Sequence, residues 1–178
     1  MTNGSLNKEA LNSRSRTLVG GADLDVRLRL TFLAGWSTFG IELALHNPRA
    51  AIHAGGFWDL GDPGSIRLRS AGIGVATPSA PAGWRVSLSP ERPAAAGVAP
   101  LAVRQLGSGG AHWQSRVHLN RDGVVAVDGP GAVASGIDDL AIDRARPWIA
   151  GDHATGTLAL TSRRFWEVFP KAIEADGD

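Results

Sequence analysis

The chain has 178 residues, a length that fits one domain or two small ones. Its 18 lysines and arginines nearly balance 17 acidic residues, and the net charge of +1 argues against a nucleic-acid footprint and against a polybasic membrane anchor. The absence of cysteine excludes a disulfide framework, a zinc ribbon and a thiol nucleophile. Because tyrosine is also absent, a tyrosine general base is excluded.

The N-terminal segment 1–22 is polar and contains no apolar stretch. It therefore predicts no secretory signal peptide, and a cytoplasmic location if the chain is complete. No apolar run elsewhere is long enough to span a bilayer, so no membrane partner is expected. Because 1–22 also lacks hydrophobic periodicity, we expect a flexible N-terminal arm there. Residues 23–178 are expected to form a single domain.

The first strongly patterned region lies at 26–32 and 39–45, where apolar and polar residues alternate. Two such runs separated by a short turn are typical of a β-hairpin. A Gly- and Pro-rich loop over 47–65 follows, and its sequence Asp62-Pro63-Gly64-Ser65 predicts a type II turn. Such a turn requires positive φ at its third residue, which explains the glycine.

Further strands are predicted from short apolar runs bounded by turn residues, at 66–69, 84–88, 101–105, 124–127, 140–142 and 157–161. The chain holds 23 glycines and 10 prolines, a content that favours many turns. We expect at most one or two helical turns near 165–168, because Pro170 ends that segment. The pattern predicts an all-β fold, an antiparallel β-sandwich with long Gly/Pro-rich loops and little helix.

Three motifs in a fixed order carry a family resemblance. They are HAGGFWDLGDPGS at 53–65, GSGGAHWQSRVHLNR at 107–121 and RRFWEVFPKAIEADGD at 163–178. Together they make residues 24–178 resemble the central β-sandwich domain of the exo-acting rhamnogalacturonan lyases and their YetA-like relatives. The chain departs from the family pattern at Ala54, at Leu106-Gly107 and at Val117, so the segment 107–118 is where the resemblance supports a site least.

The resemblance implies β-elimination on pectin-type chains of galacturonate and rhamnose, in enzymes that join this sandwich to an α/α toroid domain. An isolated sandwich is then expected to lack full catalytic activity without that toroid. Two alternatives stay open. The chain is either a non-catalytic carbohydrate-binding or assembly domain, or an orphan fragment of a lyase gene.

A uronate lyase needs a base that is neutral at working pH and a cation that neutralises the substrate carboxylate. With tyrosine excluded, the candidate catalytic residues are His53, His118 and Lys171. Each has an ordinary structural alternative: the histidines can hydrogen-bond loop backbone, and Lys171 can be a solvated surface lysine.

Sugar rings stack on indole and hydrogen-bond to polar side chains, so the candidate substrate-binding residues are Trp58, His112, Trp113, Arg146 and Trp166. No cofactor is required by the sequence. A calcium ion is a weaker option, with Asp59 and Asp62 as candidate ligands, although both can instead accept loop backbone N–H bonds. Finally, a sandwich cut from a larger enzyme should bare an apolar face, and we expect Trp166, Phe169 and Ile173 to form it.

Overall fold

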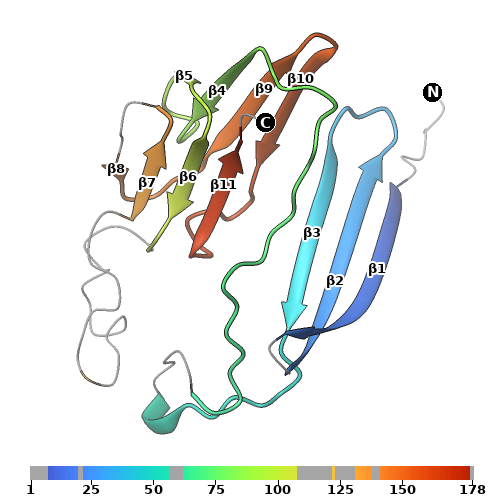
Figure 1. The fold of residues 1–178 in the computed structure, drawn as a ribbon, viewed down its shortest axis with the longest axis vertical. Helices are drawn as coiled ribbons and strands as arrows, with labels where there is room; N and C mark the ends of the chain where they lie inside the picture. Colours follow the sequence, from blue (N-terminus) through green and yellow to red (C-terminus); the bar gives the residue numbers. More distant parts are fainter. Residues whose placement is uncertain are drawn as a thin grey trace, which may run out of the picture. The chain divides into compact units, whose positions relative to one another are not determined.

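The computed structural model (Figure 1) describes residues 8–19, 22–56, 62–107, 122, 131–137 and 141–176, with side chains from Leu24 onward. They divide into two compact units, Met1–Val75 and Ala76–Asp178. This differs from the single domain expected over 23–178. The stretch at 70–80, which contains the boundary between the units, is exposed and has no regular secondary structure.

The N-terminal unit is built on one antiparallel sheet with the order β1-β2-β3. Its strands are β1 (Lys8–Val19), β2 (Ala22–Leu33) and β3 (Phe39–His46). Strands β2 and β3 pair from Asp25↔His46 to Phe32↔Phe39, which confirms the predicted hairpin. Its register places apolar residues of the two strands opposite each other, so that one face of the hairpin is apolar throughout.

Strand β1 differs from the expected arm without regular structure. It pairs with β2 along its whole length, from Lys8↔Leu33 to Val19↔Ala22. Ladder hydrogen bonds come from the backbone, so a strand at a sheet edge forms without the alternation that predicted the hairpin.

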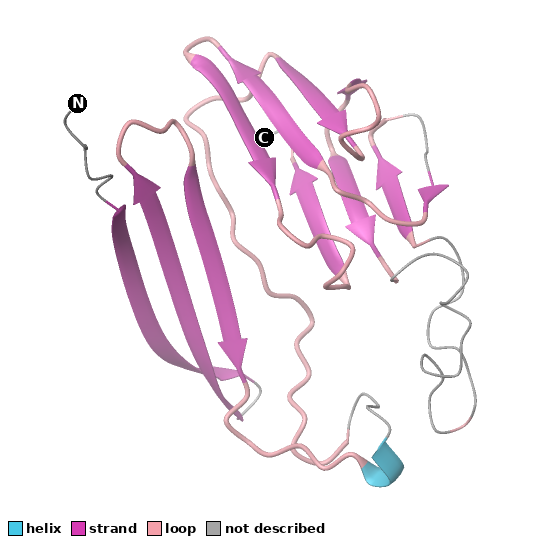
Figure 2. Cartoon of the chain, turned by 180° about the vertical axis from the view of Figure 1, so that it is seen from behind, coloured by secondary structure: helices cyan, strands magenta, loops and turns pink. Residues whose placement is uncertain are grey.

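The C-terminal unit contains two four-stranded antiparallel sheets (Figure 2). One has the order β10-β9-β4-β5, formed by β4 (Gly83–Ser87), β5 (Ala95–Gly97), β9 (Trp148–His153) and β10 (Gly156–Thr161). The other has the order β11-β6-β7-β8, formed by β6 (Leu101–Gln105), β7 (Ala132–Ser135), β8 (Ala141–Ile142) and β11 (Lys171–Ala175).

Both sheets contribute to one hydrophobic core, which makes this unit a β-sandwich. Its largest buried side chain, Phe165, comes from the connection between β10 and β11 and is 1% exposed. The strands supply most of the remaining buried core, including Val86, Leu101, Val103 and Ile149. The all-β fold class with antiparallel sheets is therefore confirmed.

The predicted strands at 84–88, 101–105 and 157–161 match β4, β6 and β10 to within one residue. The predicted strand at 66–69 is absent. Alternation of apolar and polar residues is not sufficient for a strand, because a strand also needs a neighbouring strand to hydrogen-bond with. The strand predicted at 124–127 lies outside the described residues. Helix is limited to a 3₁₀ turn at Ala54–Gly56 among the described residues, and near 165–168 one bond runs from the Val168 N–H to the Arg164 carbonyl at 3.2 Å.

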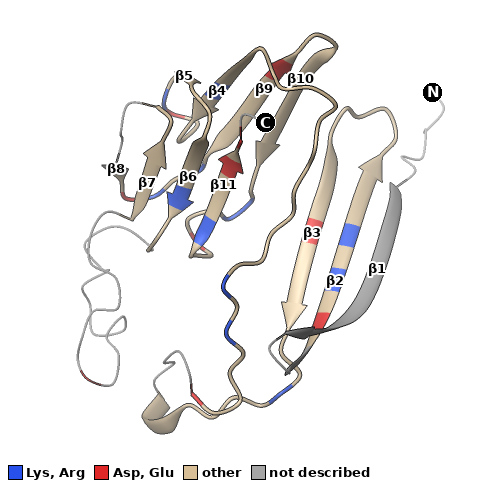
Figure 3. Cartoon of the chain, viewed as in Figure 1, with Lys and Arg blue, Asp and Glu red and all other residues tan. Residues whose placement is uncertain are grey.

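Figure 3 marks where charged residues lie along the strands, and several of them form ion pairs between neighbouring strands of the sandwich. Arg85 on β4 donates to both carboxylate oxygens of Asp152 on β9, at 3.0 and 2.7 Å, and the Thr157 hydroxyl donates to the same carboxylate at 2.7 Å. Hydrogen bonds from Arg85 and then from Thr157 hold the pKa of Asp152 below its ordinary value of 3.8.

This pairing predicts an acid-sensitive contribution to stability. Because the pKa of Asp152 is lowered on folding, ionised Asp152 stabilises the fold above its unfolded pKa, and this is lost as pH falls through the folded pKa. Asp152→Asn should therefore lower the melting midpoint at neutral pH and flatten its decline below about pH 4. Arg85→Gln should flatten the decline in the same way. If the melting midpoints of the two variants fall with decreasing pH as steeply as that of wild type, the prediction is contradicted.

Candidate functional site

The described parts of the first motif, residues 53–56 and 62–65, lie close together in the N-terminal unit. Its predicted turn is present: the Ser65 N–H donates to the Asp62 carbonyl at 2.9 Å, and Gly64 has φ 86°. The Ile52 N–H donates to the Pro63 carbonyl at 2.9 Å, and the Asn47 side-chain amide donates to the Gly64 carbonyl at 2.7 Å. These bonds hold the two arms of the loop together, so residues far apart in the motif meet.

That closure brings His53 and Asp62 into contact. The His53 Nδ1 lies 2.9 Å from the Asp62 Oδ2, and the side chains are only 18% and 5% exposed. Since an ionised carboxylate can only accept, the imidazole N–H donates from Nδ1, and this fixes the ring's orientation and tautomer.

The two residues were expected separately, His53 as a catalytic candidate and Asp62 as a weak calcium candidate. In the structure Asp62 is the partner of His53, a role that the sequence spacing of nine residues did not signal. No group of three or more His, Cys, Asp or Glu side chains arranged for a metal ion occurs among the described residues. Asp59, the other candidate calcium ligand, lies outside the described residues.

Four more candidates also lie outside the described part of the chain. They are Trp58 in the first motif and His112, Trp113 and His118 in the second. Their predicted roles in sugar contact and proton transfer stay predictions.

The remaining candidates belong to the C-terminal unit. Trp166 is half-buried, and the Arg144 guanidinium lies over its ring at 4.3 Å from the centroid. This cation–π contact occupies one face of the indole, and nothing in the sequence signalled it. Arg146 donates to Glu91 at 2.6 Å in an exposed ion pair, so its charge is already balanced locally.

Lys171 begins β11 and is half-buried. Its Nζ lies 3.4 Å from the carbonyl oxygens of Arg163 and Arg164, and Arg164 has the positive φ of 52°. Burial, followed by the charge of Arg164, lowers the pKa of Lys171. The amine therefore supports the turn before β11, a structural role that competes with the expected one of carboxylate clamp.

The expected apolar face at the C-terminal end is wrong in its residues. Trp166, Phe169 and Ile173 are all half-buried, and Ile173 packs against the sandwich core. The strand register explains this, because Ile173 pairs with Val103, a core residue of β6. Most of the exposed large apolar side chains lie outside 163–178. Three of them, Phe32, Phe39 and Leu45, are on the β2–β3 hairpin.

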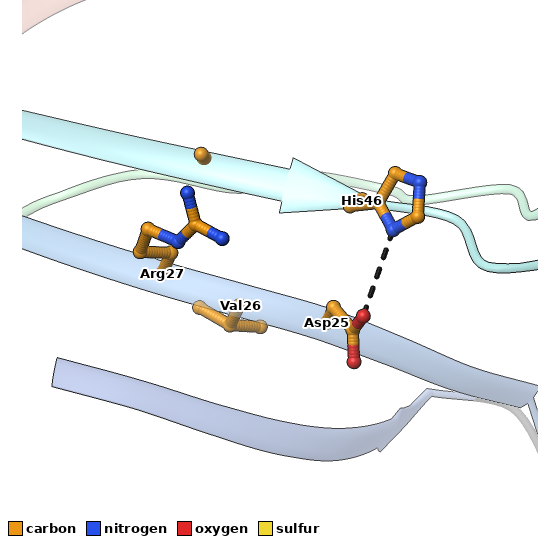
Figure 4. Close-up of a pocket in the computed structure, with 5 residues that line it drawn as sticks. Asp25, Val26, Arg27 and His46 are labelled. Carbon is orange, nitrogen blue, oxygen red and sulfur yellow. Dashed lines mark ion pairs between the residues drawn. The ribbon is translucent and has the colours of Figure 1, made fainter.

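A pocket on the sheet of the N-terminal unit was not predicted (Figure 4). It is lined by Asp25, Val26, Arg27, Ala44 and His46. The His46 Nδ1 lies 3.6 Å from the Asp25 Oδ2, and the His46 side chain is 72% exposed. Ion pairs this exposed contribute little to stability, and this imidazole is far less constrained than that of His53.

Among the described residues, no helix is long and apolar enough to cross a membrane. Comparisons with protein-family models, with curated proteins and with solved structures found no match to this chain.

Proposed function

We propose that the chain is a carbohydrate-recognising β-sandwich protein related to the rhamnogalacturonan lyases, with its sugar site at the 53–65 loop. The observation that carries this proposal is the His53–Asp62 pair. A half-buried imidazole oriented by a buried carboxylate can hydrogen-bond a sugar hydroxyl or accept an acidified sugar proton. Such an arrangement exceeds what is needed to close the loop, because backbone bonds already do so.

In this proposal His53 is the base. The positive charge that neutralises the substrate carboxylate has to come from another group. Elimination from a uronate removes the proton beside the carboxylate and expels the oxygen on the neighbouring carbon, so a base and a charge neutraliser must both reach the sugar. His53 supplies the base. Neither Lys171, held by backbone carbonyls, nor Arg146, paired with Glu91, is fully available as the neutraliser. We therefore propose binding without turnover for the chain alone, and turnover only with a toroid partner that completes the cleft.

Binding can be measured by calorimetry with rhamnogalacturonan oligosaccharides, and turnover by the ultraviolet absorbance of the unsaturated product. We expect His53→Gln to weaken binding about tenfold, because a good hydrogen bond at a sugar is worth about 1.4 kcal/mol. His153→Gln is the matched control, since His153 ends β9 in the other unit.

The outcomes separate the alternatives. Turnover by the chain alone would make it an enzyme, and binding that His53→Gln weakens without turnover would support the proposal. Binding unaffected by His53→Gln would favour a carbohydrate-binding domain with another site. No binding to any uronate-containing oligosaccharide would refute the proposal and leave an assembly domain or an orphan fragment.

A further inference from the structure

The pocket on the β2–β3 hairpin contains an arginine with unusual cross-strand neighbours. The pocket has a volume of about 390 Å³, and its charged or titratable lining residues are Asp25, Arg27 and His46. These side chains share one face of the sheet, since the register pairs Asp25 with His46 and Arg27 with Ala44. Figure 4 shows the Arg27 guanidinium reaching from β2 toward β3. Because Ala44 is short, the position opposite Arg27 leaves room for a ligand.

The two arginines on this face of β2 differ in their surroundings. Arg29 is opposite Glu42 on β3, and its Nη1 lies 3.2 Å from the Glu42 Oε2. Arg27 is opposite Ala44, and the structure gives it no hydrogen bond or ion pair with any residue in the described part of the chain. Arg27 is also exposed, so its guanidinium N–H donors are open to a ligand from solvent.

Strand β1 adds a second arginine position beside the first. In the β1–β2 register, Arg14 pairs with Arg27, and Arg16 pairs with Asp25. Asp25 thus has a basic residue opposite it, whereas the cross-strand positions of Arg27 hold Arg14 and Ala44. Like charges at directly opposite positions destabilise an antiparallel pair of strands. Positions that break such a local rule are expected at functional sites, where a ligand can supply the missing charge.

We propose that this pocket binds an oxyanion, either the carboxylate of an acidic sugar or a phosphate group, with Arg27 as its main ligand. The planar guanidinium presents parallel N–H donors that match a pair of anion oxygens. The bound charge also offsets the repulsion between Arg27 and Arg14, so that binding stabilises the sheet. His46 adds an imidazole that can donate one hydrogen bond in either neutral tautomer. The pocket does not depend on the His53–Asp62 site or on the proposed function.

Thermal unfolding of the full chain tests the proposal, in galacturonate, inorganic phosphate, neutral galactose or sodium chloride, with the three salts at one ionic strength. We expect galacturonate or phosphate to raise the melting midpoint of wild type above its value in galactose and in chloride, because a ligand that binds only the folded state stabilises it. The anion with the larger effect identifies the source of the oxyanion.

Arg27→Gln should change the melting midpoint in two ways. Without an anion the midpoint should rise, because the repulsion from Arg14 is removed. The anion concentration needed for a given further rise should increase at least tenfold, because hydrogen bonds to a charged group are lost. Arg69→Gln is the matched control, since it removes the same charge from an exposed position of the same unit. It should keep the response of wild type to both anions.

Two results would overturn the proposal. One is a wild type that responds to neither anion. The other is an equal response of Arg27→Gln and Arg69→Gln, because phosphate also stabilises proteins by exclusion from their surface, and net charge alone acts on both variants alike.

Arg14→Gln keeps the test decisive if Arg27→Gln fails to fold. Arg14 is the register partner of Arg27, so its removal should relieve the same repulsion and raise the midpoint without an anion. It should also weaken the response to the anion, since one of the two neighbouring positive charges is lost. If Arg14→Gln behaves like Arg69→Gln in both respects, the two arginines do not act together and the proposal is contradicted.

Discussion

Gly64→Ala is expected to destabilise the chain by about 3 kcal/mol, near the upper end of what backbone strain costs. Two effects add at this position. Gly64 has φ 86°, where any side chain is strained, and an added Cβ would overlap the Ala50 carbonyl oxygen and lie 2.9 Å from its carbon. The loop would have to open, and this would separate His53 from Asp62.

Gly35→Ala is the matched control for the strain alone. Gly35 has φ 77°, but an added Cβ meets nothing within 4 Å, so we expect a loss of about 1 kcal/mol. Urea unfolding gives the free energies, and hydrogen exchange of the Ile52 and Ser65 amides reports the loop itself. Equal losses for the two variants would show that the close approach to Ala50 is relieved without cost.

Gln105→Leu is expected to destabilise the sandwich by about 3–5 kcal/mol, because it leaves several buried backbone groups without partners. Gln105 is completely buried. Its side-chain amide donates to the carbonyls of Gly107, Gly131 and Asp143 at 2.6, 3.0 and 2.9 Å, and its carbonyl accepts from the Ala145 N–H at 2.9 Å. The leucine matches the size of the glutamine but replaces none of these bonds.

The control for this substitution is the preceding residue of β6. Arg104 forms an exposed ion pair with Glu174, with an Nη2–Oε1 distance of 2.6 Å, and Arg104→Leu should cost less than about 1 kcal/mol. Both free energies come from urea unfolding. If Gln105→Leu lowers the free energy of unfolding no more than Arg104→Leu does, water must hydrogen-bond to the carbonyls that Gln105 leaves.

The sequence predicted those strands in which burial on one side produces alternation. The hairpin of β2 and β3 is the clearest case, because its apolar residues fall on one face. Strand β9 was missed because its central residues Ile149, Ala150 and Gly151 are all buried, so no alternation appears. Strand β1 was missed for lack of periodicity, although the Gly20-Gly21 pair that follows it in the sequence is typical of a two-residue hairpin connection.

The candidate site was predictable only in part. The turn over Asp62-Pro63-Gly64-Ser65 followed from its residue types, since proline and glycine each satisfy one position of the turn. The contact between His53 and Asp62 did not follow, because it depends on Asn47 and Ile52 drawing the loop arms together. Long-range contacts of this kind leave no periodic trace in a sequence.

The carbonyl of Gly131 accepts from the backbone N–H groups of Leu106 and Gly107, at 2.7 and 3.1 Å, as well as from Gln105. The chain thus leaves the sandwich at Gly107 and returns to it at the same spot. The two ends of the connection between β6 and β7 are therefore fixed to each other by backbone hydrogen bonds, independently of the sequence between them. The sugar candidates of the second motif, His112, Trp113 and His118, lie in the sequence between these two fixed ends, so substitutions at them can be tested without touching the hydrogen bonds that join β6 to Gly131.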